Sequence, residues 1–417
     1  MTVLRKKLAV LAAALMASVL PAAAADLVIY HGWSSPAEVA ALNVLKAGLE
    51  AKGDTWTDLA IPHDSGASVS LINLITGGNP PNVFMESNPG MYRDIFSQGL
   101  GFDLTSFFND NHITENLPAA VQKVIQVDGM IVKVPTALHI DGMVYYNMEV
   151  AKAAGVDPHS WTSLDDMFAD FDKVKAAGYI PLAIGGQQWQ VGYLFHTLAA
   201  AVGGPEFFTK VFGTEPDISA IDSDEMRATV DMMRRFQQAT DEGSVNRDWN
   251  VTTNLVITGK ALMQIHGDWM KGEWNSAGKV AGTDFGCVNI PGTKALSVTV
   301  DAWGLLGGDG VPEETKKAEL DFASVVVDPV IQANFAKAKG STPVRLDAPK
   351  DQLDICSAEV LKALDDVNKQ VPNPHNTANE DWRTATEIVL FNFWSDPSMT
   401  TDQVVEELKS QFESILG

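Results

Sequence analysis

Apolar residues are spaced along this chain in two alternating patterns. Short apolar runs predict strands at 27–30, 82–85, 130–134, 143–146, 179–184, 261–265 and 298–306. Between these runs apolar residues recur every three or four positions, as in Leu164, Met167 and Phe171, and this spacing predicts helices. Because strands alternate with helices, we expect α/β architecture with parallel sheets covered on both faces.

The first predicted helix carries a clear start signal. Ser35 as N-cap, Pro36 at the first helical position and Glu38 three residues after the cap form a capping box. The face expected to be buried holds Val39, Leu42, Leu45 and Leu49. Glu38 therefore has a structural role in this cap, and that role is compatible with binding a ligand as well.

Other helices and turns are also marked by their flanking residues. A helix is expected to begin after Ser163 and to end at Gly178. Asp128-Gly129 predicts a turn between two strands. Further helices are expected through 226–233 and, at the end of the chain, through 404–415.

Polar and aromatic residues gather in four loops that follow predicted strands, at 31–35, 86–89, 185–189 and 266–269. In open α/β sheets, ligands bind in the crevice beyond the carboxyl ends of the strands. These loops are rich in Trp, Gly, Gln, His, Asp and Glu. Aromatic faces suit the C–H surfaces of a sugar and planar polar groups suit its hydroxyls. The loops therefore favour a carbohydrate site.

The amino-terminal segment has the features of a secretory signal peptide. Three basic residues at 5–7 precede an apolar stretch at 8–20, and Ala23 and Ala25 form an Ala-x-Ala exit. We therefore expect residues 1–25 to be removed. The apolar stretch is shorter than the roughly 20 residues that span a bilayer. Since no Cys follows the cut directly, we expect a free periplasmic protein without a membrane anchor.

The charge of the chain excludes one class of partner. Three of the 30 basic residues lie in the leader, which leaves 27 basic against 53 acidic residues and a formal charge of −26. Nucleic-acid backbones are bound by clustered Lys and Arg, so no nucleic-acid partner is expected.

The roughly 390 residues that remain are more than one hydrophobic core usually holds, so two domains are expected.

Cys287 and Cys356 are the only cysteines, 69 positions apart. In an oxidising compartment they can form a disulfide, and two buried free thiols are the alternative. Neither has a second Cys or a His at the spacing of zinc ligands. No metal site and no cofactor are expected from these motifs.

Four segments in order closely resemble the glucose-type sugar-binding proteins of ABC importers, in the extracellular solute-binding protein family 1. They are 31–38, 185–190, 263–273 and 339–345. The resemblance implies a two-lobed periplasmic binding protein (venus-flytrap) fold, each lobe a mixed sheet flanked by helices, and it implies that the two cysteines are paired. We expect the lobes to be 26–135 plus 299–342, and 136–298 plus 343–417. Hinges are expected near Pro135-Thr136, because Pro fixes one backbone dihedral beside freer neighbours, and near Thr299.

The resemblance and the four polar loops together give the predicted ligand residues. They are Trp33, Glu38, Glu86, His139, Trp189, Asp268, Trp269, Asp301, Lys339 and His375. Trp33 lies in a polar loop outside any apolar period, which favours ligand contact over core packing. Lys339 also suits a helix-end cation, and His139 suits packing near the interlobe crossover as well as ligand contact. Charged groups make hydrogen bonds of about 1.5–3 kcal/mol.

The chain departs from the glucose-binding pattern at three places. It has Gly32 where those members typically have Trp, Glu86 where they have Lys, and no aromatic residue in 140–143. A lost Trp opens space, and Glu in place of Lys turns a donor into an acceptor. We therefore expect a carbohydrate that ranges from a glucose-like monosaccharide to a small oligosaccharide, a related glycoside or a polyol.

The expected function is that of a non-enzymatic, monomeric binding component that delivers sugar to the membrane permease of an ABC importer. Two alternative functions, an enzyme and an iron-binding protein, remain open. A secreted glycoside hydrolase needs two carboxylates about 5–10 Å apart. A ferric-ion-binding protein would use tyrosines such as Tyr145-Tyr146, but neighbours in a strand point to opposite faces.

Overall fold

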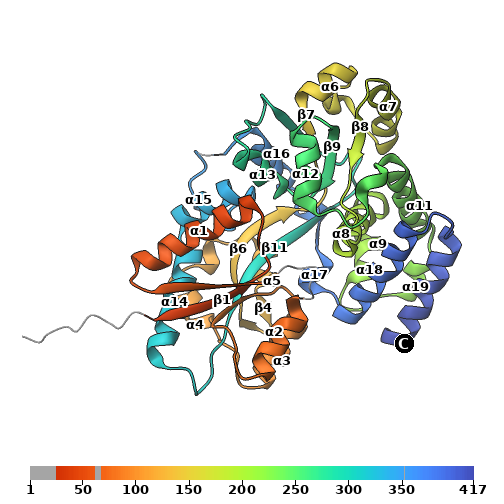
Figure 1. Cartoon of the computed structure of the whole chain (residues 1–417). Coiled ribbons are helices and arrows are strands. Elements are labelled where there is room, and N and C mark those ends of the chain that lie inside the picture. The colour runs from red at the N-terminus through yellow and green to blue at the C-terminus, as the bar shows by residue number, and fades with distance from the viewer. Residues whose placement is uncertain (1–24, 62–66, 352) are drawn as a thin grey trace, which may run out of the picture.

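Two mixed β-sheets, connected by long strands, organise the chain (Figure 1). The computed structural model describes residues 25–61, 67–351 and 353–417. The predicted signal peptide lies outside these ranges apart from Ala25. In the part of the chain that is described, no helix is long and apolar enough to cross a membrane.

The first sheet has the strand order β12-β11-β3-β1-β2, and β6 also pairs with β11, along residues 298–303. Its strands are β1 Asp26–His31, β2 Thr55–Ala60, β3 Val83–Met85, β6 Val134–Ile140, β11 Leu296–Leu305 and β12 Gln370–Pro372. Strand β1 is parallel to β2 and β3, and β11 is parallel to β12, whereas β11 is antiparallel to β3 and β6.

The second sheet has the order β10-β7-β9-β8. Its strands are β7 Met143–Asn147, β8 Ile180–Ala183, β9 Ala261–His266 and β10 Phe285–Asn289. Only β8 and β9 are parallel. The mixed sheets of the predicted fold class are confirmed, whereas the purely parallel sheets suggested by strand–helix alternation alone are wrong. Antiparallel neighbours arise because β7 and β11 follow direct crossings between the sheets, from β6 and from β10, rather than helical crossovers.

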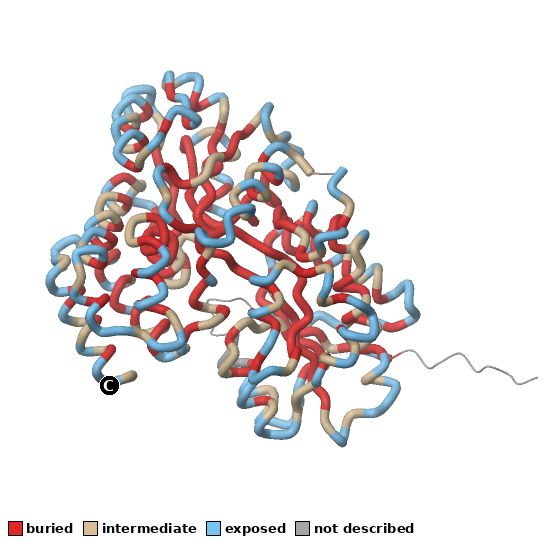
Figure 2. Tube along the Cα trace, turned by 180° about the vertical axis from the view of Figure 1, so that it is seen from behind, coloured by how far each residue is buried: buried red, intermediate tan, exposed pale blue. Residues whose placement is uncertain are grey.

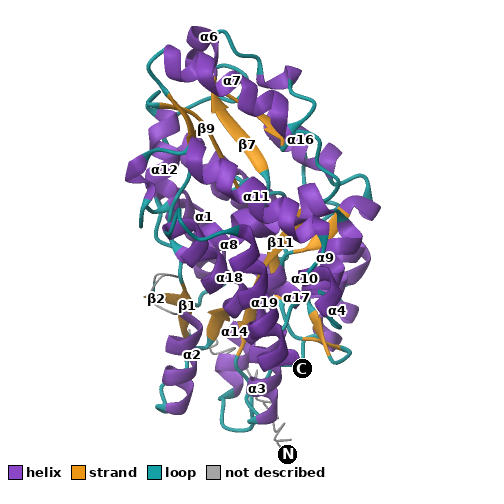
Figure 3. Cartoon of the chain, turned by 90° about the vertical axis from the view of Figure 1, so that its right-hand side faces the viewer, coloured by secondary structure: helices purple, strands orange, loops and turns teal. Residues whose placement is uncertain are grey.

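Helices enclose both sheets (Figure 3). Near the first sheet lie α1 Pro36–Ala51, α2 Ala67–Thr76, α3 Pro89–Ser97, α4 Thr105–Asp110, α5 Ala119–Val124, α14 Glu313–Val326, α15 Pro329–Lys339 and the hairpin β4 Gln126–Val127 with β5 Met130–Ile131. Near the second lie α6 Met148–Ala154, α7 Leu164–Ala176, α8 Gln188–Leu198, α9 Pro205–Phe212, α10 Ile218–Ile221, α11 Asp224–Ala239, α12 Trp249–Ile257, α13 Met270–Ser276, α16 Ile355–Ala363, α17 Pro374–Thr377, α18 Glu380–Ser395 and α19 Thr401–Leu416. Figure 2 shows the strands buried and the outer helix surfaces exposed.

The predicted helix caps are confirmed. Ser35 and Glu38 form the reciprocal capping box of α1, with Pro36 in its first turn. Ser163 caps α7, and Gly178 follows the end of that helix with φ 87°. One position of the predicted buried face is wrong: Val39 is 44% exposed, because the α1 surface that packs on the core is centred on Leu42, Leu45 and Leu49.

The turn predicted at Asp128-Gly129 is confirmed, with φ of 51° and 84° in the hairpin between β4 and β5. The single strand predicted at 130–134 is wrong, because two strands occupy this region. β5 pairs only with its hairpin partner, and β6 begins at Val134 as a partner of β11.

The chain passes from the first sheet to the second between β6 and β7, at Asp141-Gly142. The Asp141 carboxylate is buried there and accepts hydrogen bonds from Ser297 Oγ (2.5 Å), Thr299 Oγ1 (2.7 Å) and Asn373 Nδ2 (2.7 Å). Burial raises the pKa of Asp141 to about 6 against the lowering effect of these donors. This one carboxylate therefore ties together three segments that are distant in sequence.

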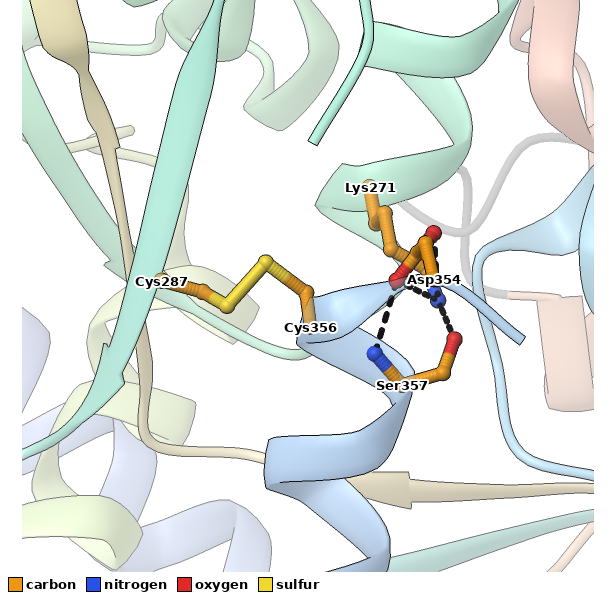
Figure 4. The surroundings of a disulfide bond; sticks show 5 residues. All are labelled: Lys271, Cys287, Asp354, Cys356 and Ser357. Carbon is orange, nitrogen blue, oxygen red and sulfur yellow. Dashed lines mark hydrogen bonds and ion pairs between the residues drawn. A yellow bond between two sulfur atoms is a disulfide. The ribbon is translucent and has the colours of Figure 1, made fainter. Parts of the chain in front are cut away.

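The two cysteines form a disulfide between β10 and α16 (Figure 4), with Cα atoms 5.8 Å apart. The pairing implied by the family resemblance is thereby confirmed. Beside it, Lys271 contacts Ser357 Oγ and lies 3.4 Å from Asp354 Oδ2. Asp354 also caps α16 by accepting from the Ser357 amide at 2.8 Å. The disulfide and this polar cluster hold α16 against the second sheet.

Reduction of the disulfide is expected to lower the free energy of unfolding by about 4 kcal/mol, because a crosslink over 69 positions limits the unfolded chain. Urea denaturation of the mature protein with and without reductant measures this loss. The double variant Cys287→Ala/Cys356→Ala is the control, since reductant should leave its unfolding curve unchanged. Equal midpoints for oxidised and reduced wild-type protein would contradict the expectation.

Candidate functional site

Three of the predicted ligand residues meet on the strands and loops that connect the two sheets. His139 on β6 is fully buried; its Nδ1 lies 2.5 Å from Asp268 Oδ1 and its Nε2 lies 3.1 Å from Asp301 Oδ2. Burial lowers the pKa of His139, but the two carboxylates outweigh this effect and raise it to about 9. His139 is therefore an imidazolium at neutral pH that donates from both ring nitrogens. Its burial fits the packing role, and ligand contact by His139 stays a prediction.

A group of aromatic rings adjoins this ion cluster. It consists of Trp189, Tyr193, His266, Trp269 and His375, which come from α8, the end of β9 and α17. Tyr193 is the centre: its ring centroid lies 5.6 Å from Trp189, 5.7 Å from Trp269 and 5.1 Å from His375. Trp269 in turn packs edge-on against His139 at 5.1 Å. We name these five residues the aromatic cluster.

The aromatic cluster and its neighbours retain partly accessible surface. Trp189, Tyr193 and His375 are half-buried. The side chain of Asp301 is 20% exposed although it contacts His139. The cluster therefore offers aromatic faces beside a carboxylate and an imidazole, which is the combination that binds sugars.

A second group of predicted residues lies around Lys339, at the end of α15. Its ammonium is 3.7 Å from Glu38 Oε1 and lies over the rings of Trp33 and Trp269, at 4.8 and 5.7 Å. The carboxylate is close enough for ion pairing, and the two rings are close enough for cation–π attraction. Lys339 is 3% exposed, so it is a buried, paired cation rather than a solvated helix-end cation.

Trp33 is packed more deeply than its polar loop suggests. It is 4% exposed and contacts Trp303 at 5.7 Å and Phe335 at 5.8 Å. Glu38 Oε2 accepts from the backbone amides of Ser34 and Ser35, both at 2.9 Å. Trp33 and Glu38 thus have structural roles, and their contact with a sugar stays a prediction.

Glu86 follows β3 and is half-buried. Its Oε1 accepts from the amides of Ser87 (2.7 Å) and Asn88 (2.9 Å). Burial and the Arg383 guanidinium lower the pKa of His375, whereas the carboxylates of Glu387 and Glu86 act in the opposite direction. Glu86 of the first sheet therefore lies within electrostatic reach of the aromatic cluster.

Several residues of this region were missed by the sequence analysis. Tyr193 and His196 lie on α8, while Arg383 and Glu387 lie one turn apart on α18. The α8 residues follow the polar loop 185–189 directly at helical spacing, which was an available signal. For Arg383 and Glu387 the only signal was an i, i+4 pair of opposite charges, which is common on solvent-exposed helix faces.

The two alternatives to sugar binding find no support in the geometry. Tyr145 packs on Phe285, whereas Tyr146 packs on His159 in a different core cluster, so the two hydroxyls do not face one site. Of the acidic residues among the predicted ligands, Asp268 and Asp301 both pair with His139, and Glu38 lies 3.7 Å from the Lys339 ammonium.

A cavity of about 610 Å³ lies elsewhere, and none of the ten predicted ligand residues lines it. Its walls include Leu138, Val298 and Val300, which alternate along β6 and β11 with His139, Thr299 and Asp301. The cavity therefore lies on the opposite face of these strands from the ion cluster. Its lining is mainly aliphatic, so the ion and aromatic clusters are the better candidate for a polar ligand.

Comparison with known proteins agrees with this geometry. Residues 32–314 match the family described as bacterial extracellular solute-binding protein. The chain is 35% identical over 343 residues to a probable sugar-binding periplasmic protein of Mesorhizobium japonicum, covering 81% of this chain and 80% of the relative. It is 27% identical over 355 residues to an uncharacterised ABC transporter extracellular-binding protein of Pyrococcus horikoshii, covering 81% and 76%.

Solved structures share the fold. A chitin oligosaccharide binding protein is similar with a TM-score of 0.80 and 18% identity, covering 94% of this chain and 100% of that chain. MalE3 of T. maritima with bound maltose is similar with a TM-score of 0.77 and 19% identity, at the same coverage. These likenesses confirm the two-lobed fold with mixed sheets.

The His139 ion cluster predicts a specific pH dependence of stability. Because its folded pKa, about 9, lies above the ordinary value of about 6.5, protonated His139 stabilises the fold fully below pH 6.5 and loses this effect as pH rises to 9. Between pH 7 and 9, the unfolding free energy of wild type should fall by about 2 kcal/mol more than that of His139→Gln. Parallel curves from urea denaturation would show that His139 is not charged in the fold.

Proposed function

This chain belongs to the bacterial extracellular solute-binding protein family, and from this premise we propose that it captures a small carbohydrate and delivers it to the membrane permease of an ABC importer. Its relatives are periplasmic sugar-binding proteins by name, and it is a binding protein rather than an enzyme. We place its site of action in the periplasm and expect it to act there as a monomer.

The observation that carries the proposal is the aromatic cluster beside the ion cluster. The half-buried rings of Trp189 and Tyr193 offer flat surfaces for sugar C–H groups. Asp301 and His375 stand beside them with polar atoms that accept or donate to hydroxyls. A few fixed polar groups around aromatic walls give both affinity and orientation to a small neutral ligand.

We infer the range of candidate sugars from the acidic side chains near the aromatic cluster. Glu86 and Asp301 offer acceptors on the side of the first sheet, where a glucose-binding member has a Lys donor in place of Glu86. Gly32 leaves room where those members have Trp. We propose a glucose-like monosaccharide, a small oligosaccharide, or a related glycoside or polyol that presents several hydroxyl donors.

Closure of the lobes is the proposed mechanism. We assign the lobes to 26–135 plus 299–342 and to 136–298 plus 343–417. Residues 136–140 of β6 and 370–372 of β12 pair with β11 of the first sheet, so we count them as the join between the lobes. A sugar that contacts both lobes stabilises the closed state, because only that state offers both sets of contacts. Polar contacts between the lobes support this assignment: the amide of Ala37 donates to Glu273 Oε1 at 3.1 Å, and Lys339 reaches Trp269. The permease can then distinguish loaded from empty protein by shape.

Calorimetric titration of the mature protein against monosaccharides, disaccharides and polyols is expected to give one-to-one binding, with no product formed. Trp189→Ala should weaken binding of the best ligand at least tenfold, or about 1.4 kcal/mol, because it removes an accessible aromatic face. Tyr179→Ala is the matched control, since Tyr179 is half-buried in the same lobe but outside the aromatic cluster.

Two results would contradict this proposal. Turnover of any sugar would indicate an enzyme, and absence of binding across the panel would remove the carbohydrate ligand. An affinity of Trp189→Ala within about twofold of wild type would leave sugar binding intact but place it away from the aromatic cluster.

A further inference from the structure

Three potential metal ligands converge next to the aromatic cluster. They are His196 on α8, His375 on α17 and Glu387 on α18, and one ligand atom of each lies within 4.8 Å of the other two. Glu387 Oε1 lies 3.0 Å from His375 Nε2 and 3.9 Å from His196 Nε2. Three elements thus present nitrogen and oxygen donors to one point.

Among these three residues, His196 is the one whose neighbours do not satisfy its hydrogen-bonding groups. Its side chain is fully buried, and among the described residues neither ring nitrogen has a hydrogen-bond partner. A buried polar group without a partner costs about 1–3 kcal/mol, and such groups in folded proteins usually have a bound water or ion as partner. Its Nε2 lies 3.9 Å from Glu387 Oε1, so an ion bound between them would satisfy it.

In the structure, the Arg383 guanidinium supplies the positive charge next to these three side chains. Its Nη1 donates to Glu387 Oε1 at 2.8 Å and lies 3.2 Å from His375 Nε2. Glu387 Oε1 and His375 Nε2, which lie 3.0 Å apart, are therefore both next to the same guanidinium. The same guanidinium has other partners available, because its Nη2 lies 3.2 Å from Thr384 Oγ1 and 3.6 Å from Glu380 Oε1.

We propose that His196, His375 and Glu387 bind a divalent transition-metal ion, with Zn²⁺ as the reference ligand, after the Arg383 guanidinium moves toward Glu380. Two His and one Glu form a known set of zinc ligands that leaves a fourth position open. Bonds of about 2.0–2.1 Å in a tetrahedron place ligand atoms about 3.3 Å apart. The two separations from Glu387 Oε1, 3.0 and 3.9 Å, bracket this value, and all three ligand atoms lie within 4.8 Å of one another, so side-chain shifts must bring the two histidines closer to one ion.

This metal site goes beyond the proposed sugar binding and does not depend on it. The nitrogen donors select a transition metal over Ca²⁺ and Mg²⁺, which prefer oxygen ligands. Arg383 and the metal compete for Glu387 and His375. Removal of Arg383 should therefore strengthen metal binding, whereas a purely structural role for the Arg383–Glu387 ion pair predicts no such gain.

The test is calorimetric titration of chelator-treated mature protein with Zn²⁺ in the absence of sugar. We expect one equivalent to bind, at least tenfold weaker binding for His375→Ala and for Glu387→Gln, and several-fold tighter binding for Arg383→Gln. His112→Ala is the matched control, because His112 also lies 3.0 Å from a carboxylate, that of Glu115, but at the surface. Ca²⁺ and Mg²⁺ should not bind at this site.

Circular dichroism of each variant establishes that it is folded. Should Glu387→Gln fail to fold, His375→Ala and Arg383→Gln decide the question, since both side chains lie nearer the surface. Absence of Zn²⁺ binding by wild type overturns the proposal. Zn²⁺ binding that is unchanged in His375→Ala, or weakened in Arg383→Gln, overturns it as well. Since no sugar is present, these results are independent of the sugar titration.

Discussion

The burial of charged groups where the two sheets join is the constraint on which the rest of this structure depends. A charge removed from water is tolerated only with partners of opposite charge and hydrogen bonds. His139 satisfies two carboxylates, and Asp141, two residues further on, has three hydrogen-bond donors. Because these partners come from β11, the loop after β9 and the residues after β12, the polar groups fix how the crossing segments lie against each other.

Because side chains alternate along a strand, β6 and β11 present two different surfaces. On β6 and β11, His139, Thr299 and Asp301 alternate with Leu138, Val298 and Val300. The first set faces the ion cluster, and the second lines the aliphatic cavity. Trp269 follows Asp268 directly, so the ion pair to His139 also positions an aromatic ring against the imidazole. The aromatic cluster is thus placed by the same contacts that hold the crossing.

Local features were readable from the sequence, whereas long-range packing was not. The caps at Ser35 and Ser163 depend on residues three positions away, so their prediction was sound. Trp33 looked like a loop residue outside the core, but it packs against Trp303 and Phe335, which lie 270 and 302 positions further along the chain. His196 and Glu387 were missed because each sits in an ordinary helix, and only tertiary packing brings α8 and α18 together.

Most predicted ligand residues already have partners, and this shapes how any ligand can bind. Glu38 uses one oxygen in the α1 cap and the other toward Lys339, and Lys339 also lies over two tryptophan rings. A sugar hydroxyl that binds to these groups would replace an existing hydrogen-bond partner rather than satisfy an unpaired group. The net free-energy gain per hydrogen bond is therefore modest. The free-energy gain must then come largely from aromatic surface, while the prearranged charges fix orientation at little cost in side-chain entropy.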